Sequence, residues 1–389
     1  MVSFKATTLL ILSIIQSLRC TKNEDTNYAA KDNFTRISTN ESNHFSVMLN
    51  KSPLNEPKNG WITNEVDFVS RSGVLIEGDA VYAPTDDGIS KINRNTGGTV
   101  WQLELCDYPE GNMIMQENTI FLSSEECFYA IDKKNGDVLW GKDITHPITA
   151  TPVVVNDLVI ISDESKGVYA FESNSGKLRW VFPIVDGSNR SIPLYQNGKL
   201  FVASAFGILY VLNPVDGKKI TEFSVGDKEV NVPLIGIDNI IVLSNVDSEI
   251  FLYDENGAQL WEFKYPNPTR IYFKGAAYNG GKIILTGRTN TNEEITVCVS
   301  SDTRKLIWEH KSGKQSKISN PLIVNNSDVL IASSEGLYCL NIESGNVNWT
   351  KQITSSSGFI QNQSTPFISV TNREIIYTTF DNRLVKLIL

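Results

Sequence analysis

Residues 128–140 read FYAIDKKNGDVLW, and the same frame returns as VYAFESNSGKLRW at residues 168–180 and as LYCLNIESGNVNW at residues 337–349. In each copy an apolar run ends at Asp, Glu or Asn, a glycine follows four residues later, and a tryptophan closes the frame. The alternating run predicts a strand with one buried face. The polar residue and the glycine predict a tight antiparallel turn, since the side chain accepts backbone N–H groups and glycine tolerates positive φ. The tryptophan then lies on the returning strand, where its ring can cover a junction between stacked sheets.

The tryptophans define a repeat that covers most of the chain. Successive tryptophans are separated by 40, 39, 40, 81, 47 and 41 residues, and the interval of 81 spans two repeats with Thr221 in the place of the missing ring. A further 40 residues lead from the last tryptophan to the C-terminus, so the arithmetic gives eight units. A period of about 20 to 50 residues is typical of solenoids, propellers and arrays. The structural repeat residues are Trp61, Trp101, Trp140, Trp180, Trp261, Trp308 and Trp349.

Each unit carries two more apolar segments upstream of the frame, such as residues 151–155 and 158–161. Four short antiparallel strands per 40 residues are typical of a propeller blade. The chain ends on the third strand of its last unit, at residues 384–387, whereas Trp61 lies on a spare fourth strand before the first complete unit. We therefore predict an all-β, eight-bladed β-propeller of four-stranded antiparallel blades. Pairing of the N- and C-terminal strands would close the ring and remove its open edges.

The sixth unit departs from the others. The interval of 47 residues between Trp261 and Trp308 places about six extra residues at 288–294, and Ser300 and Arg304 stand where the other units have Asp and Gly. A hairpin turn needs only about two to five residues. We therefore predict a loop that protrudes from one face of this blade.

The N-terminal segment has the pattern of an export signal. Lys5 and the apolar run at residues 8–18 predict a signal peptide at residues 1–20, because the run is too short to span a bilayer with these flanks. Cys20 is a candidate lipid anchor. Arg19, however, stands where lipoprotein signals carry a small residue, so an ordinary cleaved signal peptide is the alternative.

The next segment, residues 21–58, is rich in Asn, Ser, Thr, Lys and Glu. It has too few large apolar residues to offset its ordering entropy, and we predict a flexible polar tether. The propeller is then predicted to occupy residues 59–389. Asn-x-Ser/Thr sequons occur along the chain, and their glycosylation would need a eukaryotic host.

Composition excludes some functions. The net charge of −9, without a cluster of Lys and Arg, argues against a nucleic-acid partner. The three histidines, His44, His146 and His310, are scattered, and we interpret them as ordinary surface or turn residues. Metal binding and general-base catalysis both need clustered ligands or partners. We therefore predict no catalytic residue, no metal site and no cofactor.

The cysteines divide into two groups. Cys298 and Cys339 lie ten residues before a frame tryptophan, where other copies have alanine, and we predict that both are small buried residues. Cys106 and Cys127 fall in one unit. They could form a disulfide in an oxidising compartment or remain two thiols.

The frame Tyr-Ala-x-Asp-x-x-x-Gly-x-x-x-Trp resembles the pyrroloquinoline-quinone-like repeat β-propeller family over roughly residues 59–389. The quinone-dependent dehydrogenases of that family carry adjacent cysteines, which this chain lacks. The overall plan of signal peptide, cysteine, tether and single propeller resembles the BamB-type outer-membrane protein assembly lipoproteins. The resemblance implies a non-enzymatic scaffold of the bacterial envelope, in the periplasm or at the outer membrane, that binds a protein partner such as a barrel-assembly protein.

The resemblance also implies where that partner would bind. BamB-type proteins hold it through loops near the middle of the ring that carry an Arg before a Ser-x-Pro run and an Asp-x-Asp in the next blade. Residues 187–193, GSNRSIP, match the first element in part, while residues 226–233, GDKEVNVP, lack the second. The candidate partner-binding residues are therefore Asn189, Arg190 and Ser191.

Two alternatives of other classes stay open. The first is a quinone- or metal-dependent oxidoreductase, since the same repeat builds such enzymes. The second is a secreted propeller that binds a surface ligand. The fold alone cannot separate them, because propellers host many activities.

Overall fold

The structure is a computed structural model of the chain. The described residues are 46–47, 56–63 and 73–389, apart from 106–107, 110–112, 145, 149, 165–166, 186–191, 227–229, 231–233, 238–239, 245–247, 267–269, 315–317, 334–335, 353–367, 371–373 and 379–382.

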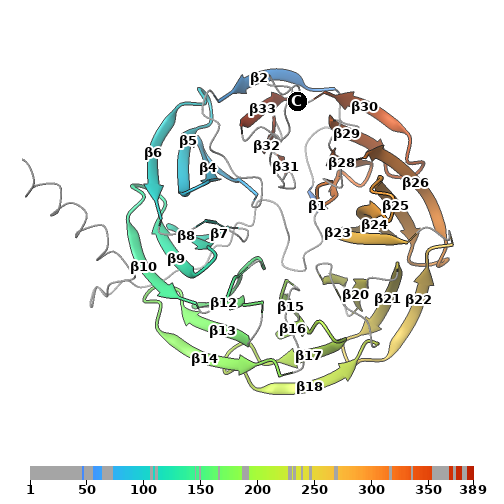
Figure 1. Cartoon of the computed structure of the whole chain (residues 1–389), viewed down its shortest axis with the longest axis horizontal. Coiled ribbons are helices and arrows are strands. Elements are labelled where there is room, and N and C mark those ends of the chain that lie inside the picture. The colour runs from blue at the N-terminus through green and yellow to red at the C-terminus, as the bar shows by residue number, and fades with distance from the viewer. Residues whose placement is uncertain are drawn as a thin grey trace, which may run out of the picture.

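Eight β-sheets are arranged around a ring, and within each sheet the strands follow one another from the centre of the ring to its rim (Figure 1). Seven of them, blades 1 to 7, are each built from four consecutive strands. Blade 1 contains β3 (Leu75–Glu77), β4 (Ala80–Thr85), β5 (Gly88–Asn93) and β6 (Thr99–Glu104). Blades 2 to 4 contain β7 (Ile114–Gln116), β8 (Thr119–Ser123), β9 (Cys127–Asp132), β10 (Val138–Asp143); β11 (Val153–Val155), β12 (Leu158–Ser162), β13 (Gly167–Glu172), β14 (Leu178–Pro183); and β15 (Leu194–Gln196), β16 (Lys199–Ala203), β17 (Ile208–Leu212), β18 (Lys219–Ser224).

Blades 5 to 7 contain β19 (Ile235–Ile237), β20 (Ile240–Ser244), β21 (Glu249–Asp254), β22 (Gln259–Lys264); β23 (Ile271–Asn279), β24 (Lys282–Thr289), β25 (Glu294–Ser300), β26 (Leu306–Gly313); and β27 (Leu322–Val324), β28 (Asp328–Ser333), β29 (Gly336–Asn341), β30 (Val347–Lys351). The remaining sheet, the closing blade, joins β31 (Ile368–Val370), β32 (Glu374–Thr378) and β33 (Leu384–Ile388) to the N-terminal strand β2 (Lys58–Ile62).

The structure corrects the predicted fold class, because not every blade is a four-stranded antiparallel sheet. Seven blades are built from continuous runs of strands, and the C-terminal run supplies three strands that β2 completes, as predicted. Blade 7 has a fifth strand, β1 (Ser46–Val47), which pairs in parallel with β27 from a segment predicted to be tether. The sequence pattern did not predict β1, because β1 pairs with β27 through backbone groups. The backbone of an edge strand can pair with any extended segment, whatever its side chains.

The predicted closure of the ring by its two terminal strands is confirmed. Strand β2 pairs antiparallel with β33, with Lys58 opposite Ile388 and Ile62 opposite Val385. Glu374 on β32 forms ion pairs with Arg94 of blade 1 and with Lys386, whose Nζ lies 2.8 Å from Glu374 Oε2. The carboxylate is almost fully buried, so this polar cluster ties the closing blade to blade 1.

The frame tryptophans lock neighbouring blades, as their position on the returning strand predicts. The ring of Trp180 packs on Gly217 of the next blade, where φ is +69° and a Cβ would overlap the ring. Its Nε1 donates a hydrogen bond of 3.0 Å to the carbonyl of Pro214. Four other tryptophans donate in the same way to the next turn, Trp61, Trp101, Trp140 and Trp308.

The junction between blades 4 and 5 lacks this tryptophan. Thr221 holds the expected position opposite Val211 and is exposed, while Phe223, two residues later, packs its ring on Gly257. Glu255 strengthens the same junction, because its buried carboxylate accepts hydrogen bonds from Gln196, Asn197 and Lys199 of blade 4 at 3.0, 2.7 and 3.2 Å. A smaller ring and a buried polar cluster thus replace the missing tryptophan.

The predicted protruding loop of blade 6 is wrong. The residues at 288–294 form the end of β24, a tight turn and the start of β25, with Thr289 N bonded to Glu293 O at 2.9 Å. The extra residues lengthen the strands of blade 6 to 9, 8, 7 and 8 residues, against 3 to 6 in the other seven sheets apart from the two-residue β1. Added residues gain ladder hydrogen bonds in this way, whereas a loop would leave them unpaired. Arg304 takes the positive φ that glycine has in the other turns.

Candidate functional site

The predicted partner-binding residues Asn189, Arg190 and Ser191 lie outside the described residues, as do Cys20 and Cys106. The partner-binding site, the lipid anchor and the disulfide between Cys106 and Cys127 therefore stay predictions. The thiol of Cys127 is buried, and its Sγ lies 3.5 Å from Asp143 Oδ1.

The prediction for the other two cysteines is confirmed. Cys298 and Cys339 are fully buried, and each pairs across the sheet with its tryptophan, Trp308 or Trp349, as Ala130 does with Trp140. Burial raises the pKa of the Cys298 thiol to about 12 and also raises the pKa of Cys339. Both thiols therefore stay protonated at neutral pH, which suits a packing role and not a nucleophilic one.

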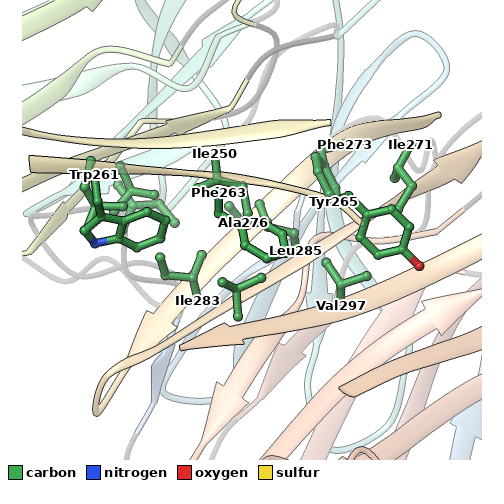
Figure 2. Packing of buried hydrophobic residues seen from close by; sticks show 14 of the residues in the cluster. Ile250, Trp261, Phe263, Tyr265, Ile271, Phe273, Ala276, Ile283, Leu285 and Val297 are labelled. Atoms are coloured by element: carbon green, nitrogen blue, oxygen red, sulfur yellow. The ribbon is translucent and has the colours of Figure 1, made fainter. Parts of the chain in front are cut away.

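Blade 6 presents two contrasting faces, and the first is apolar. Figure 2 shows Trp261 and Phe263 of blade 5 against Ala276, Leu285 and Val297 of blade 6. All five side chains are buried, and Ile271, Phe273 and Ile295 extend the same cluster along the lengthened strands. This face is a continuous hydrophobic core that fixes blade 6 against blade 5.

The face that points to blade 7 is apolar at only one end. The row Ala277–Ile284–Cys298–Trp308 packs against blade 7. The next row, Gly275–Thr286–Thr296–His310, is polar, and the row after it, Tyr272–Arg288–Glu294–Gly313, carries charges. These two rows belong to the added length of the blade. We call them, with Arg270, Lys274 and Ser312 beside them, the polar face of blade 6.

The outer row combines an aromatic ring with cations. The guanidinium carbons of Arg270 and Arg288 lie 5.2 and 4.8 Å from the centroid of the Tyr272 ring. Arg288 also donates through Nη1 to Asn292 Oδ1 at 3.0 Å. Lys274 lies at a bulge of β23, and although the side chain as a whole is exposed, its pKa is lowered first by desolvation and then by the positive charge of Arg288. Cationic groups are therefore concentrated at this end of the blade.

The inner row contains buried polar atoms that no described residue satisfies. Thr296 Oγ1, His310 Nε2 and Ser312 Oγ are buried and make no hydrogen bond with the described residues. The His310 ring lies 5.4 Å from the ring of Tyr338 on blade 7, and its pKa is lowered because burial disfavours the charged form. Thr286, beside Thr296, does have a partner, because its hydroxyl donates to Ser319 O at 2.7 Å.

This arrangement can bind but shows no catalytic set. Guanidinium and ammonium groups suit an anion, and hydroxyl and imidazole groups next to them can donate further hydrogen bonds. Among the described residues there is no group of three or more His, Cys, Asp or Glu side chains that could hold a metal ion. No helix in the described part of the chain is long and apolar enough to cross a membrane.

The model of the family described as "Outer membrane protein assembly factor BamB" matches residues 85–185 and 168–387. The chain belongs to this BamB-type family of quinone-like repeat propellers. The BamB-type identification confirms the resemblance on which the sequence interpretation relied.

The curated relatives of this BamB-type chain are distant. Tetrathionate hydrolase of Acidithiobacillus ferrooxidans is 23% identical over 78% of this chain, which spans 62% of that protein. The outer membrane protein assembly factor BamB of Yersinia pestis is 19% identical over 76% of this chain and 79% of its own length. BamB of Burkholderia pseudomallei is 22% identical over 55% of this chain and 58% of its own length.

Solved structures show the same fold. The crystal structure of BamB from Moraxella catarrhalis matches with a TM-score of 0.65 at 15% identity, covering 85% of this chain and all of that one. Quinohemoprotein alcohol dehydrogenase from Comamonas testosteroni matches with a TM-score of 0.71 at 10% identity, covering 85% of this chain and 76% of that one. A BamB protein and an alcohol dehydrogenase thus share the architecture of this BamB-type propeller.

Sequence reasoning missed the polar face. The interval of 47 residues was interpreted as a loop, and His310, which is half-buried, was interpreted as an ordinary surface or turn residue. Residues 270–274 (RIYFK) and 294–297 (EITV) alternate apolar side chains with charged or hydroxyl-bearing ones. That alternation could have indicated extended strands with one polar side.

Proposed function

We propose that this chain is a non-enzymatic scaffold of the bacterial envelope that binds a protein partner in outer-membrane protein assembly. The observation that carries the proposal is the family match over residues 85–387. The proposal includes export by residues 1–20 and attachment of the propeller through Cys20, with the part of the predicted tether (residues 21–58) that precedes β1 as the link.

The geometry supports a scaffold. Each junction between blades is fixed by buried side chains, and six of the frame turns place glycine under or beside an aromatic ring of the preceding blade. A rigid ring can vary the connections between its strands without loss of the core, and such connections are where binding residues concentrate. The predicted contacts Asn189, Arg190 and Ser191 belong to one connection of this kind, between β14 and β15.

Co-purification tests the proposal. The full chain carrying a C-terminal tag should recover an outer-membrane assembly protein from detergent-solubilised envelopes after reversible crosslinking. A tagged exported protein of unrelated fold is the control. Recovery of no assembly protein above that control would overturn the proposed process. The intact mass of the purified chain tests the anchor, since a diacylglyceryl addition at Cys20 is expected.

A hydrolase is the second candidate, because 78% of this chain resembles tetrathionate hydrolase in sequence. Purified full chain incubated with tetrathionate separates the two candidates. The scaffold predicts no loss of tetrathionate above the buffer blank. Turnover that depends on the folded chain would replace the scaffold with an enzyme.

A further inference from the structure

We propose that the N-terminal segment passes through the centre of the propeller, held by β1 on the inner edge of β27, and that the tether leaves the ring on the face that carries the predicted contact at residues 189–191. The path of the chain follows from the directions of the strands. Its consequence for an attached protein, that this face turns toward the membrane, rests on the proposed function.

The connections between strands lie alternately on two faces of the ring, because successive strands of a blade are antiparallel. On the first face, which we call the connection face, the fourth strand of a blade leads into the next blade and the second strand turns into the third. The connection between β14 and β15 lies there. On the opposite face, the turn face, the first strand turns into the second and the third into the fourth, as at Gly217 beside Trp180.

Strand β1 fixes the direction in which the N-terminal segment crosses the ring. It pairs in parallel with β27, with Ser46 opposite Ile323 and Val47 opposite Val324. It lies at the centre of the ring, where β23 of blade 6 is its other neighbour (Figure 1). As the first strand of blade 7, β27 runs from the connection face to the turn face. Strand β1 runs the same way, so the chain enters it from the connection face.

The next described residues lie at the turn face, on the other side of the ring. Lys351 Nζ lies 3.2 Å from Pro57 O and 3.7 Å from Glu56 Oε1. Lys142, which like Lys351 stands two residues after a frame tryptophan, lies against the turn glycine Gly176 of the next blade. Glu56 and Pro57 thus take the place that the turn between the third and fourth strands has in other blades. The chain enters β1 from one face and reaches β2 from the other.

The segment between Val47 and Lys58 is long enough for this path. An extended chain spans about 3.4 Å per residue, so about ten residues reach about 35 Å. Neighbouring strands of a sheet lie about 4.8 Å apart, and the first and fourth strands of a blade are therefore separated by about 15 Å. The length permits a crossing from the inner edge of blade 7 to the outer strand of the closing blade.

The sequence around β1 favours an enclosed position. Residues 45–49 read FSVML and are the most apolar run of this length between residues 21 and 58. Apolar residues with strand propensity favour an extended segment that is shielded from water. In the part of the chain that the structure describes, blade 7 is also the only sheet with a fifth strand, so β27 is the inner edge that this segment occupies.

For a propeller attached through Cys20, this path turns the connection face toward the membrane. The remaining tether, residues 21–45, has an r.m.s. end-to-end length of about 28 Å as a flexible chain. The predicted contact at residues 189–191 is then on the membrane side, where a partner in the outer membrane would lie. A tether that ran directly to β2 would leave the rim at the turn face, and the predicted contact would be on the far side.

Distances between two spin labels, measured by double electron–electron resonance, test the path. One label is attached at Asn43→Cys, upstream of β1, and the other at Phe206→Cys or at Val215→Cys. Phe206 and Val215 are exposed residues of blade 4, in the turns before and after β17, so they mark the connection face and the turn face. Cys20 and Cys106 are replaced by serine, and Cys127, Cys298 and Cys339 are buried.

The mean distance from the Asn43 label should be shorter to Phe206 than to Val215 by about 10 Å. The reason is that a five-residue strand such as β17 separates the two faces by about 17 Å. Equal distances, or a shorter distance to Val215, would overturn the proposed path.

Proline substitutions test whether β1 holds the segment. Ser46→Pro combined with Val47→Pro removes two backbone N–H groups, and should widen the distribution of distances to Phe206 at least twofold. The matched control, Ser38→Pro with Thr39→Pro, makes a similar change upstream of β1 and should leave that distribution unchanged. Widening in both variants, or in neither, would show that β1 does not hold the segment. Thermal unfolding confirms that each variant keeps the fold, which β2 still closes.

The outcomes separate this path from the proposed function. If the labels place Asn43 at the connection face but no assembly protein is recovered, the path stands and the assigned process falls. If Asn43 lies nearer Val215 while an assembly protein is recovered, the scaffold stands with a tether that does not cross the ring.

Discussion

At the end of the blades where β5 turns into β6, one contact is repeated around the ring: a glycine with positive φ under an aromatic ring, and an indole N–H bonded to the turn of the next blade. At the opposite end, where β4 turns into β5, no such rule holds. Blade 6 extends there by several residues, and its added rows differ on the two faces. The difference teaches that repetition secures the ring at one end and leaves the other end able to acquire binding groups.

The largest expected effect concerns the repeated end. Trp180→Ala should lower the free energy of unfolding by about 3 to 5 kcal/mol, since it removes a buried ring and an indole hydrogen bond. Phe223→Ala should cost less, about 1 to 3 kcal/mol, because this ring is half-buried and has no N–H to donate. Thr221→Ala should change stability by less than about 0.5 kcal/mol. Urea unfolding followed by tryptophan fluorescence measures all three.

One outcome of this series of variants would contradict the proposed role of Phe223. A cost for Thr221→Ala equal to that for Phe223→Ala would show that the junction between blades 4 and 5 does not use Phe223 as its tryptophan.

The next effect tests ring closure at the same end. Glu374→Gln should lower the free energy of unfolding by about 3 kcal/mol, because it leaves Arg94 and Lys386 without their buried carboxylate. Glu222→Gln is a matched control, since the pair Lys219–Glu222 is exposed and should contribute less than about 1 kcal/mol. Similar losses in the two variants would show that the closing blade is not held by this cluster.

The regular end could be predicted from sequence because its signal is local and periodic. Six glycines and seven tryptophans at fixed spacing give the turns, the returning strands and the closure by β2 and β33. Two features could not be predicted in the same way. Phe223 replaces a tryptophan from a position two residues away, and β1 adds to β27 through backbone groups that any sequence carries. The polar face could not be predicted either. Its character depends on which neighbouring blade each face of the sheet contacts, and the spacing of residues along the chain does not contain that information.

A smaller effect on stability is expected from two threonine substitutions at the irregular end of blade 6. Thr286 and Thr296 are opposite each other in the ladder and both fully buried, but only Thr286 has a hydrogen-bond partner among the described residues. Thr286→Val should therefore cost about 1 to 2 kcal/mol, because Ser319 O loses its donor. Thr296→Val should be neutral or stabilising by up to about 1 kcal/mol. Equal costs in chemical unfolding would mean that the Thr296 hydroxyl is as well satisfied as that of Thr286.

The smallest effect is a pH dependence at His310. Burial lowers the pKa of His310 in the folded chain, while in the unfolded chain it returns to about 6.5. Below about pH 6.5 the unfolded state therefore binds more protons than the folded state, so the free energy of unfolding falls as the pH drops towards the folded pKa. His310→Gln removes this dependence whatever it does to stability at neutral pH. Urea midpoints at pH 5.5, 6.5 and 7.5 should show the wild type losing stability relative to the variant only at the acid end. A constant difference across the three values would show that His310 is as readily protonated in the fold as in the unfolded chain, and that the inner row of the polar face is open to water.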